Sequence, residues 1–245
     1  HMLAINDASC VVTISDFTKQ KVADIYGVAD EKFFLLPPCV NGDEFYIKEL
    51  GNSASLKFNT EKKSFILLTV CRLSSAEQYK GYDIVLSALA SLKRKNYSIA
   101  YIIVGKGDDE GRVYKLISEL GLTDTASVYT AISNDELLDI YNLADAFIMP
   151  SRGEGFGIVF IEALACGLAV IAGNADASQE AVLFGKLGLI VDPSDHLQVA
   201  EVIEKCYMGT IPSQLKDRQF LRETVLDNYG YAVFKNRVRT MLEKQ

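Results

Sequence analysis

A glycine-rich loop between two carboxylates is the segment of this chain best suited to chemistry. It runs Pro150-Ser-Arg-Gly-Glu154-Gly-Phe-Gly-Ile-Val-Phe-Ile-Glu162, follows an apolar stretch and opens a helical pattern. Its glycines allow close approach to a ligand, and the amides of Gly157 to Val159 would lie unpaired at the helix start, where anions bind. Glu162 sits among apolar residues and therefore needs a partner or a ligand. Spacing alone leaves two roles open, core packing beside a nearby cation and ligand binding.

Two cations that could accompany this loop follow the first strand of the main domain. Arg72 stands at the strand's end, and Lys80-Gly81 precedes the next helix. Arginine can grip phosphate through two parallel hydrogen bonds, and lysine adds a point charge. An isolated cation is more often a solvated surface group, so only the placement after a strand favours a phosphate role. Gly105-Lys-Gly107 resembles a phosphate turn but lacks a G-x-G-x-x-G pattern, which favours a tight turn over a dinucleotide site.

The elements that must position these residues alternate between short apolar strands and helices. The strands are expected at 65–70, 99–104, 127–130, 146–149, 169–172 and 189–191, and the helices at 83–93, 110–120, 135–143, 157–166 and 178–184. An amphipathic helix is expected at 233–242. Such alternation predicts an α/β fold, a Rossmann-like parallel sheet with helices on both faces and ligands at the carboxyl ends of its strands.

The segment before this domain has a different pattern. A buried strand is expected from Cys10 to Ser15, a helix from Asp16 to Ile25 and a short strand from Phe33 to Leu36, which Pro37-Pro38 ends. Residues 48–63 are polar and predict a linker. We therefore divide the chain into residues 1–47, the linker 48–63, and a main domain over 64–245.

Composition excludes several classes of protein. The chain has 245 residues, 49% of them hydrophobic, and a net charge of −7, which argues against nucleic acid as a partner. Its five cysteines are scattered, and His196 is the one histidine outside His1-Met2, which we interpret as an expression remnant. We therefore expect no disulfide framework, no metal site and no Ser-His or Cys-His triad. No signal peptide or membrane-spanning stretch is evident.

Six short motifs in the right order resemble the GT4 family of retaining glycosyltransferases (glycosyl transferases group 1), which have the GT-B fold. The resemblance covers nearly the whole chain, and the matching motifs are Thr69-Val-Cys-Arg-Leu-Ser74, Lys80-Gly81, Ile103-Val-Gly-Lys-Gly107, Ala144-Asp-Ala-Phe-Ile-Met-Pro-Ser151, Glu154-x7-Glu162 and Ala165-Cys-Gly-Leu-Ala-Val170. The resemblance implies that this chain is the C-terminal donor-binding half of such an enzyme. Residues 1–47 would then be a remnant of the N-terminal domain and the crossover from it.

The resemblance also implies roles for individual residues. Arg72 and Lys80 would neutralise the donor diphosphate and act as electrostatic catalysts, and Glu154 would contact the sugar hydroxyls as the third catalytic residue. The remaining donor-binding positions would be Gly105, Ile132, Gly155, Phe156, Gly157, Ile158, Val159 and Glu162, with Ile132 beside the base and Glu162 on the ribose. The donor would be a UDP- or GDP-linked sugar, transferred with retention, without a metal or other cofactor, to a saccharide or lipid-linked acceptor.

The chain departs from the family's pattern at several positions. Cys71 and Thr130 stand where glycine is usual, and the loop between Arg72 and Lys80 is longer by Ser75 to Gln78. Asp176-Ala-Ser-Gln-Glu180 replaces a G-G-x-P-E turn, with only Glu180 matching. These differences bear on pocket shape and donor identity rather than on the fold.

The half of the enzyme that would hold the acceptor is not in this sequence, so we expect the chain alone to bind a donor but to transfer little. The acidic composition suggests a cytoplasmic protein, peripheral to a membrane through the N-terminal domain. Cell-surface polysaccharide or lipopolysaccharide assembly follows from family association only.

Two other functions stay open at this point. Another GT-B enzyme, a nucleotide-sugar epimerase or a phosphorylase, would need further catalytic carboxylates and histidines or a lysine for pyridoxal phosphate. A non-catalytic nucleotide-sugar-binding module would be expected to lose Arg72, Lys80, Glu154 and Glu162, all of which are present.

Overall fold

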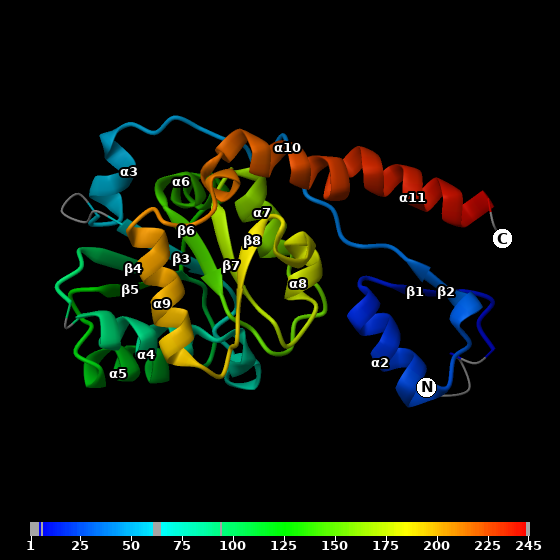
Figure 1. The fold of residues 1–245 in the computed structure, drawn as a ribbon, viewed down its shortest axis with the longest axis horizontal. Helices are drawn as coiled ribbons and strands as arrows, with labels where there is room; N and C mark the ends of the chain where they lie inside the picture. Colours follow the sequence, from blue (N-terminus) through cyan, green and yellow to red (C-terminus); the bar gives the residue numbers. More distant parts are fainter. Residues whose placement is uncertain (1–4, 6, 61–64, 94, 244–245) are drawn as a thin grey trace.

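A six-stranded parallel sheet forms the centre of the molecule (Figure 1). The computed structural model describes residues 5, 7–60, 65–93 and 95–243. The spatial order of the strands is β5-β4-β3-β6-β7-β8, and every neighbouring pair is parallel. Their bounds are β3 (Phe65–Val70), β4 (Ile99–Val104), β5 (Ala126–Tyr129), β6 (Ala146–Met149), β7 (Ala169–Gly173) and β8 (Gly188–Val191).

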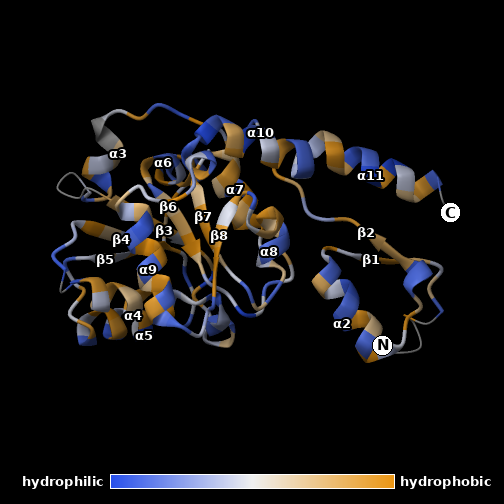
Figure 2. Cartoon of the chain, viewed as in Figure 1, coloured by the Kyte–Doolittle hydropathy of each residue, from blue (hydrophilic) through white to orange (hydrophobic). Residues whose placement is uncertain are grey.

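Helices cover both faces of this sheet, which confirms the predicted fold class. On one face α4 packs against both α5 and α9, and on the other α7 packs against α10 (Figure 1). The helices of the main domain are α4 (Tyr82–Lys93), α5 (Glu110–Glu119), α6 (Asn134–Leu143), α7 (Ile158–Ala165), α8 (Ser178–Ala181), α9 (His196–Tyr207), α10 (Arg218–Tyr229) and α11 (Tyr231–Glu243). Figure 2 shows the hydrophobic strands β6, β7 and β8 enclosed between helices of mixed hydropathy. Burial of both faces explains why these strands are continuous apolar runs.

The strand order reverses between β3 and β6, because the chain moves outward to β4 and β5 before it returns to β6. In open α/β sheets a crevice forms at such a point, outside the carboxyl ends of the strands. The segments that follow β3 and β6 contain Arg72 and Glu154. The topology therefore brings together two parts of the chain that are about eighty residues apart in sequence.

Residues before the main domain form a separate two-stranded parallel sheet with one helix. The elements are β1 (Val11–Thr13), α2 (Asp16–Tyr26), the 3-10 helix η1 (Asp30–Lys32) and β2 (Phe33–Leu35). The prediction of a buried strand from Cys10 to Ser15 is wrong in part. β1 pairs with β2 alone, and Val12 and Ile14 are 46% and 41% exposed.

Two other sequence predictions need correction. The linker expected over residues 48–63 contains the short helix α3 (Asn52–Lys57), and Phe58 after it is buried against the Tyr129 ring; residues 61–63 lie outside the described part. The helix expected over 178–184 ends at Ala181, and a 3-10 turn, η3 (Leu183–Gly185), follows. Leu183 and Phe184 both adopt positive φ, of 49° and 52°, which no right-handed helix can contain.

Candidate functional site

A pocket of about 350 Å³ lies where the turns after β3 and β6 meet. Most of its lining comes from these two turns, and Ile14 and Pro38 close it from the N-terminal segment. The residues that line it are Ile14, Pro38, Val70, Cys71, Arg72, Lys80, Glu154, Gly155, Phe156, Gly157, Ile158 and Val159. The structure thus brings together all three residues expected to be catalytic and five of the eight expected to bind the donor.

The charged side chains of this pocket form ion pairs with one another and with Glu77 of the adjoining turn, which also lies 3.7 Å from Lys80. The Arg72 guanidinium contacts the Glu77 carboxylate, and the Lys80 ammonium contacts the Glu154 carboxylate. The side chain of Arg72 is 78% exposed, whereas those of Lys80 and Glu154 are 13% and 11% exposed. Burial alone would lower the pKa of Lys80, but the contact with Glu154 outweighs it, so the pKa is raised and the amine stays charged.

Lys80 is fixed by the turn that surrounds it. It ends the 3-10 helix η2 (Ser75–Lys80), and the next residue, Gly81, has a φ of +84°. A Cβ at Gly81 would lie 2.2 Å from the carbonyl oxygen of Pro150, so only glycine allows the turns after β3 and β6 to touch. The Arg152 amide also donates a 2.9 Å hydrogen bond to the Tyr79 carbonyl. The Lys-Gly pair of the sequence therefore joins the two halves of the pocket.

Glu154 is held by a carboxylate that sequence analysis had not identified as a site residue. The Glu154 amide donates a 2.7 Å hydrogen bond to Oδ2 of Asp176, which is 3% exposed. The Ser151 hydroxyl donates to the same oxygen at 2.7 Å, and the Ser178 amide donates to Oδ1 at 2.9 Å. Asp176 follows β7 at the carboxyl edge of the sheet. This position after a strand is the one feature of the sequence that could have identified it as a site residue.

The helix that follows the loop, α7, begins at Ile158, and Gly157 is its N-cap residue. This residue has a φ of +87°, and a Cβ placed on it would lie 2.4 Å from the Phe160 ring. No side chain caps this end of the helix, and the first amides of a helix have no intrahelical acceptor. The pocket is therefore bordered by a helix N-terminus that can receive an anion as well as by the Arg72 and Lys80 cations.

Glu162 lies one helical turn beyond Ile158, beside the pocket rather than in it. The Tyr141 hydroxyl donates a 2.9 Å hydrogen bond to Glu162 Oε2, and within the described residues no cation forms an ion pair with this carboxylate. Burial raises its pKa, with the nearby Glu44 charge adding to the shift and the tyrosine opposing it. Its partner is thus a hydroxyl and not the cation that a core-packing role would have supplied.

Two further pockets extend the first along α7. One, of about 510 Å³, shares Ile158 with the first pocket and reaches Glu162, and the other, of about 530 Å³, continues from Glu162 to Asn134 and Asp135 on α6. The crossover segment from Cys39 to Tyr46 forms their outer wall. Arg222 of α10 holds that segment, donating to the carbonyls of Phe45 at 2.6 Å and Gly42 at 2.8 Å. The three pockets together form one groove, with Arg72, Lys80 and Glu154 at one end and only carboxylates as charged groups at the other.

Two of the predicted donor-binding residues do not line this groove. Gly105 lies behind the pocket, and a Cβ on it would come within 1.8 Å of the Cys71 carbonyl oxygen, which agrees with the tight-turn interpretation. Ile132 is partly buried against the core, close in sequence to Asn134 but not among the lining residues. Their binding roles stay predictions.

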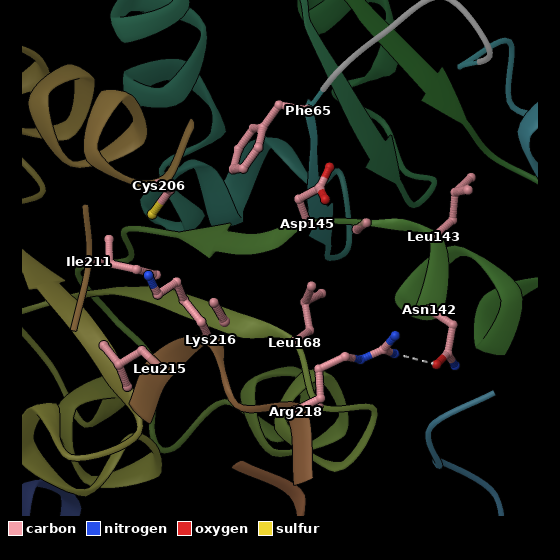
Figure 3. Close-up of a pocket in the computed structure, with 13 residues that line it drawn as sticks. Phe65, Asn142, Leu143, Asp145, Leu168, Cys206, Ile211, Leu215, Lys216 and Arg218 are labelled. Atoms are coloured by element: carbon pink, nitrogen blue, oxygen red, sulfur yellow. Dashed lines mark hydrogen bonds between the residues drawn. The ribbon is translucent and has the colours of Figure 1, made fainter. Parts of the chain in front are cut away.

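Another pocket, of about 330 Å³, lies at the opposite, amino edge of the sheet (Figure 3). Asp145 and Arg218 are its notable charged residues, and both are engaged in the fold. Asp145 accepts a 2.7 Å hydrogen bond from the Ile66 amide. Arg218 donates to Asn142 Oδ1 at 2.8 Å, as Figure 3 shows, and to the Cys166 carbonyl at 2.9 Å. The two Arg218 bonds tie α10 to α6 and to the end of α7, so Arg218 has a structural role.

Among the described residues, no group of three or more histidines, cysteines and acids could hold a metal ion. No helix in that part of the chain is long and apolar enough to cross a membrane.

Comparison with known proteins places this geometry in a family. The model of the family described as glycosyl transferases group 1 matches residues 53–224, which include every charged residue of the groove described above except Asp43 and Glu44. This chain belongs to the group 1 glycosyltransferases. The match extends over more than half of the chain and confirms the resemblance stated from the motifs.

The chain is also similar to curated proteins with glycosyltransferase names. The chain is 34% identical over 207 residues to a GDP-mannose-dependent α-(1-6)-phosphatidylinositol monomannoside mannosyltransferase of Mycobacterium tuberculosis, covering 81% of this chain and 53% of that one. It is 31% identical over 188 residues to a D-inositol 3-phosphate glycosyltransferase of Catenulispora acidiphila, covering 73% and 44%. The chain spans about half the length of the curated relatives it matches.

Solved structures agree on the fold. A glycosyltransferase from Rickettsia africae superposes with a TM-score of 0.84 at 25% identity, over 99% of this chain and 65% of that one. The sucrose-phosphate synthase of Thermosynechococcus elongatus gives the same TM-score at 23% identity, over 99% and 60%. The architecture of this chain is therefore that of the C-terminal half of the GT-B fold.

Proposed function

We propose that this chain binds a GDP-linked sugar and presents it for metal-independent transfer, with retention, to a saccharide or lipid-linked acceptor. The observation that supports the proposal most is the groove at the switch point of the sheet. It places Arg72, Lys80 and a helix N-terminus at one end and the Glu162 carboxylate at the other. The nucleoside diphosphate part of a nucleotide sugar has the matching order of chemistry, an anionic diphosphate at one end and a ribose and base with hydroxyls and N–H donors at the other.

The residues at the cationic end would act on the diphosphate. Arg72 and Lys80 supply positive charge where the leaving diphosphate gains negative charge, and such preorganised charge lowers a barrier without reorganisation. Amides at the start of α7 would add hydrogen bonds to the phosphate oxygens. Glu154, which contacts Lys80, would turn to the hydroxyls of the sugar once the phosphates take its place.

The other end of the groove favours guanine over uracil. Asp43, Glu44 and Asp135 line it together with Glu162. An ionised carboxylate only accepts hydrogen bonds. Guanine offers adjacent N1–H and N2–H donors on its Watson–Crick edge, whereas uracil offers one N–H between two carbonyl oxygens. The GDP-mannose dependence of the mycobacterial relative supports the same choice.

Calorimetric titration with GDP, UDP and ADP, and with GDP-mannose and UDP-glucose, tests this proposal. We expect saturable binding of GDP and GDP-mannose that is unchanged by Mg²⁺ or EDTA, and a loss of at least about tenfold in affinity in Arg72→Ala. Lys115→Ala is a matched control, because Lys115 is an exposed cation on α5 paired with Glu119. Tighter binding of UDP than of GDP would contradict the preference for guanine. Equal GDP affinity of Arg72→Ala and wild type would contradict the placement of the diphosphate at Arg72.

A further inference from the structure

The charged groups around the phosphate end of the groove carry no net charge. Arg72 and Lys80 contribute two positive charges, and Glu77 and Glu154 contribute two negative charges that lie against them. A neutral cluster attracts a diphosphate weakly, since the attraction of each cation is offset by a carboxylate a few ångströms away. The proposed function gives Glu154 a role on the sugar, but it gives none to Glu77.

Glu77 occupies an unusual environment for a carboxylate. Its side chain is 14% exposed, and one oxygen contacts the Arg72 guanidinium. The other oxygen, Oε2, is buried without a hydrogen-bond partner and lies 3.7 Å from the Lys80 ammonium. A buried anionic oxygen without a hydrogen bond is costly, so its presence between both phosphate-binding cations calls for an explanation.

The loop that carries Glu77 is anchored on both sides. Ser75 donates to Asp108 through its amide at 2.9 Å and through its hydroxyl at 2.6 Å, and the Glu77 amide donates to the Ser74 carbonyl at 2.8 Å. At the other end Tyr79 packs its ring against Gly153, where a Cβ would lie 3.0 Å from the ring. The carboxylate is therefore held near the cations by its backbone, whereas Arg72, 78% exposed, has room to turn away.

We propose that Glu77 is a built-in counter-anion of the diphosphate subsite. It positions Arg72 and Lys80 before the donor arrives, and the phosphates of the donor displace its carboxylate from both cations. This inference rests on the proposed function, because it assigns Glu77 to the subsite where that function places the diphosphate.

Two consequences follow for ligand recognition. A ligand must carry enough negative charge to compete with a fixed carboxylate, so a diphosphate binds and a single phosphate does not. The carboxylate also remains near the bound diphosphate and repels it, which favours release of the nucleoside diphosphate product. Glu77 thus sets both the charge threshold of the subsite and the affinity for product.

The test compares wild type with Glu77→Gln by calorimetric titration with inorganic pyrophosphate, orthophosphate and GDP. Glutamine retains an oxygen that can accept from Arg72 while it removes the charge. We expect pyrophosphate and GDP to bind about tenfold more tightly to the variant, and orthophosphate binding to become measurable. Glu119→Gln makes the same change of charge on the exposed end of α5, and its affinities should equal those of wild type within about twofold.

The gain in affinity distinguishes this role from a structural one, because damage to the loop can only weaken binding. Unchanged or weaker binding of pyrophosphate by Glu77→Gln would overturn the inference, as would an equal gain in a background that lacks both cations, Arg72→Ala with Lys80→Ala. Glu77→Ala removes the same charge and serves as the second variant if the glutamine protein does not fold.

The two proposals can fail separately. Tighter pyrophosphate binding by the variant, with no binding of GDP or of any nucleotide sugar to either protein, would contradict the proposed function and leave Glu77 as the counter-anion of an anion site. Equal binding of GDP by both proteins would support the function and overturn the role of Glu77. Absence of pyrophosphate binding to both proteins would overturn the inference.

Discussion

The Tyr141 hydroxyl donates a 2.9 Å hydrogen bond to Glu162 Oε2 inside the helical layer that flanks the sheet. Tyr141 is fully buried, and burial raises the pKa of the Glu162 carboxyl although the tyrosine opposes the shift. Because Glu162 faces two adjoining pockets, the protein keeps this carboxylate poorly solvated at the place where a ligand hydroxyl could reach it. Such an arrangement costs stability and is consistent with a binding role.

Glu162→Gln should therefore stabilise the chain and weaken nucleotide binding. The folded-state pKa of Glu162 lies above its unfolded-state value, so between the two the folded protein binds more protons, and stability falls as pH rises through that window. The glutamine side chain does not titrate, so the variant does not lose stability in this pH window. We expect Tm to rise by about 2–4 °C at pH 8 and by less at pH 4, and GDP affinity to fall about tenfold.

Differential scanning calorimetry across this pH range, together with GDP titration, checks both parts. Glu201→Gln is the control, because Glu201 lies on α9 in an exposed pair with Lys205 and its loss should change stability by less than about 0.5 kcal/mol. A lower Tm for the Glu162 variant at pH 8 would show that the carboxylate supports the fold instead.

Gly157→Ala should destabilise the protein by about 2 kcal/mol or more and reduce donor binding. A Cβ there meets the Phe160 ring at 2.4 Å, and the positive φ of +87° is unfavourable for alanine. Gly111 provides a contrast within α5, since a Cβ on it meets nothing within 4 Å. Gly111→Ala should stabilise by about 0.5–1 kcal/mol. Urea unfolding of the two variants measures both effects, and a neutral Gly157 variant would mean that the loop can relax around the methyl group.

Much of this architecture could be predicted because its signals are local. The six strands are apolar runs bounded by turns, and their alternation with helices implies a parallel sheet. Arg72 and Glu154 could be paired from their positions in the sequence, since each follows a strand and parallel strands end at the same edge. The E-x7-E spacing placed Glu162 about one turn into the helix that follows the loop.

The features that were missed depend on contacts between distant segments. Asp176 holds the Glu154 amide across the gap between β6 and β7, and Glu77 reaches both cations only because of how its loop folds. The exposure of Val12 follows from the partners of β1 and not from its own apolar residues. No periodicity indicates that Leu183 and Phe184 turn left-handed, since nothing in their residue types favours positive φ.

Cys71 should be unreactive although it lines the phosphate end of the groove. Burial raises the pKa of its thiol to about 12, with the Glu154 and Glu77 charges adding to the shift and Lys80 opposing it. Only the thiolate attacks thiol reagents, so alkylation of the folded protein by iodoacetamide at pH 8 should be at least about a hundredfold slower at Cys71 than for a free cysteine. Peptide mapping by mass spectrometry measures the rate at each cysteine. Rapid modification of Cys71 would indicate that the pocket opens widely in solution.

Hydrogen bonds to Glu180 join the N-terminal segment to the main domain. Glu180, in α8, accepts hydrogen bonds from the amides of Asp16 at 2.8 Å and Phe17 at 2.9 Å, and so satisfies the first turn of α2. A carboxylate at this end of a helix also interacts favourably with the helix dipole. Ser15 caps the same helix, accepting from the Thr18 amide at 3.0 Å. The main domain therefore holds α2 through Glu180, while the serine secures it locally.

Glu180→Ala should release α2 without disturbing the sheet. Loss of the two hydrogen bonds should increase hydrogen exchange of the Asp16–Tyr26 amides by about fivefold to thirtyfold, which corresponds to about 1–2 kcal/mol, and leave exchange in β3 and β6 unchanged. Glu31→Ala, a change at an exposed acid in the same N-terminal segment, should leave α2 as protected as in wild type. If the α2 amides of Glu180→Ala exchange as slowly as those of wild type, the Ser15 cap is sufficient to stabilise α2. The Glu180 carboxylate of this glycosyltransferase then does not hold the two parts of the chain together.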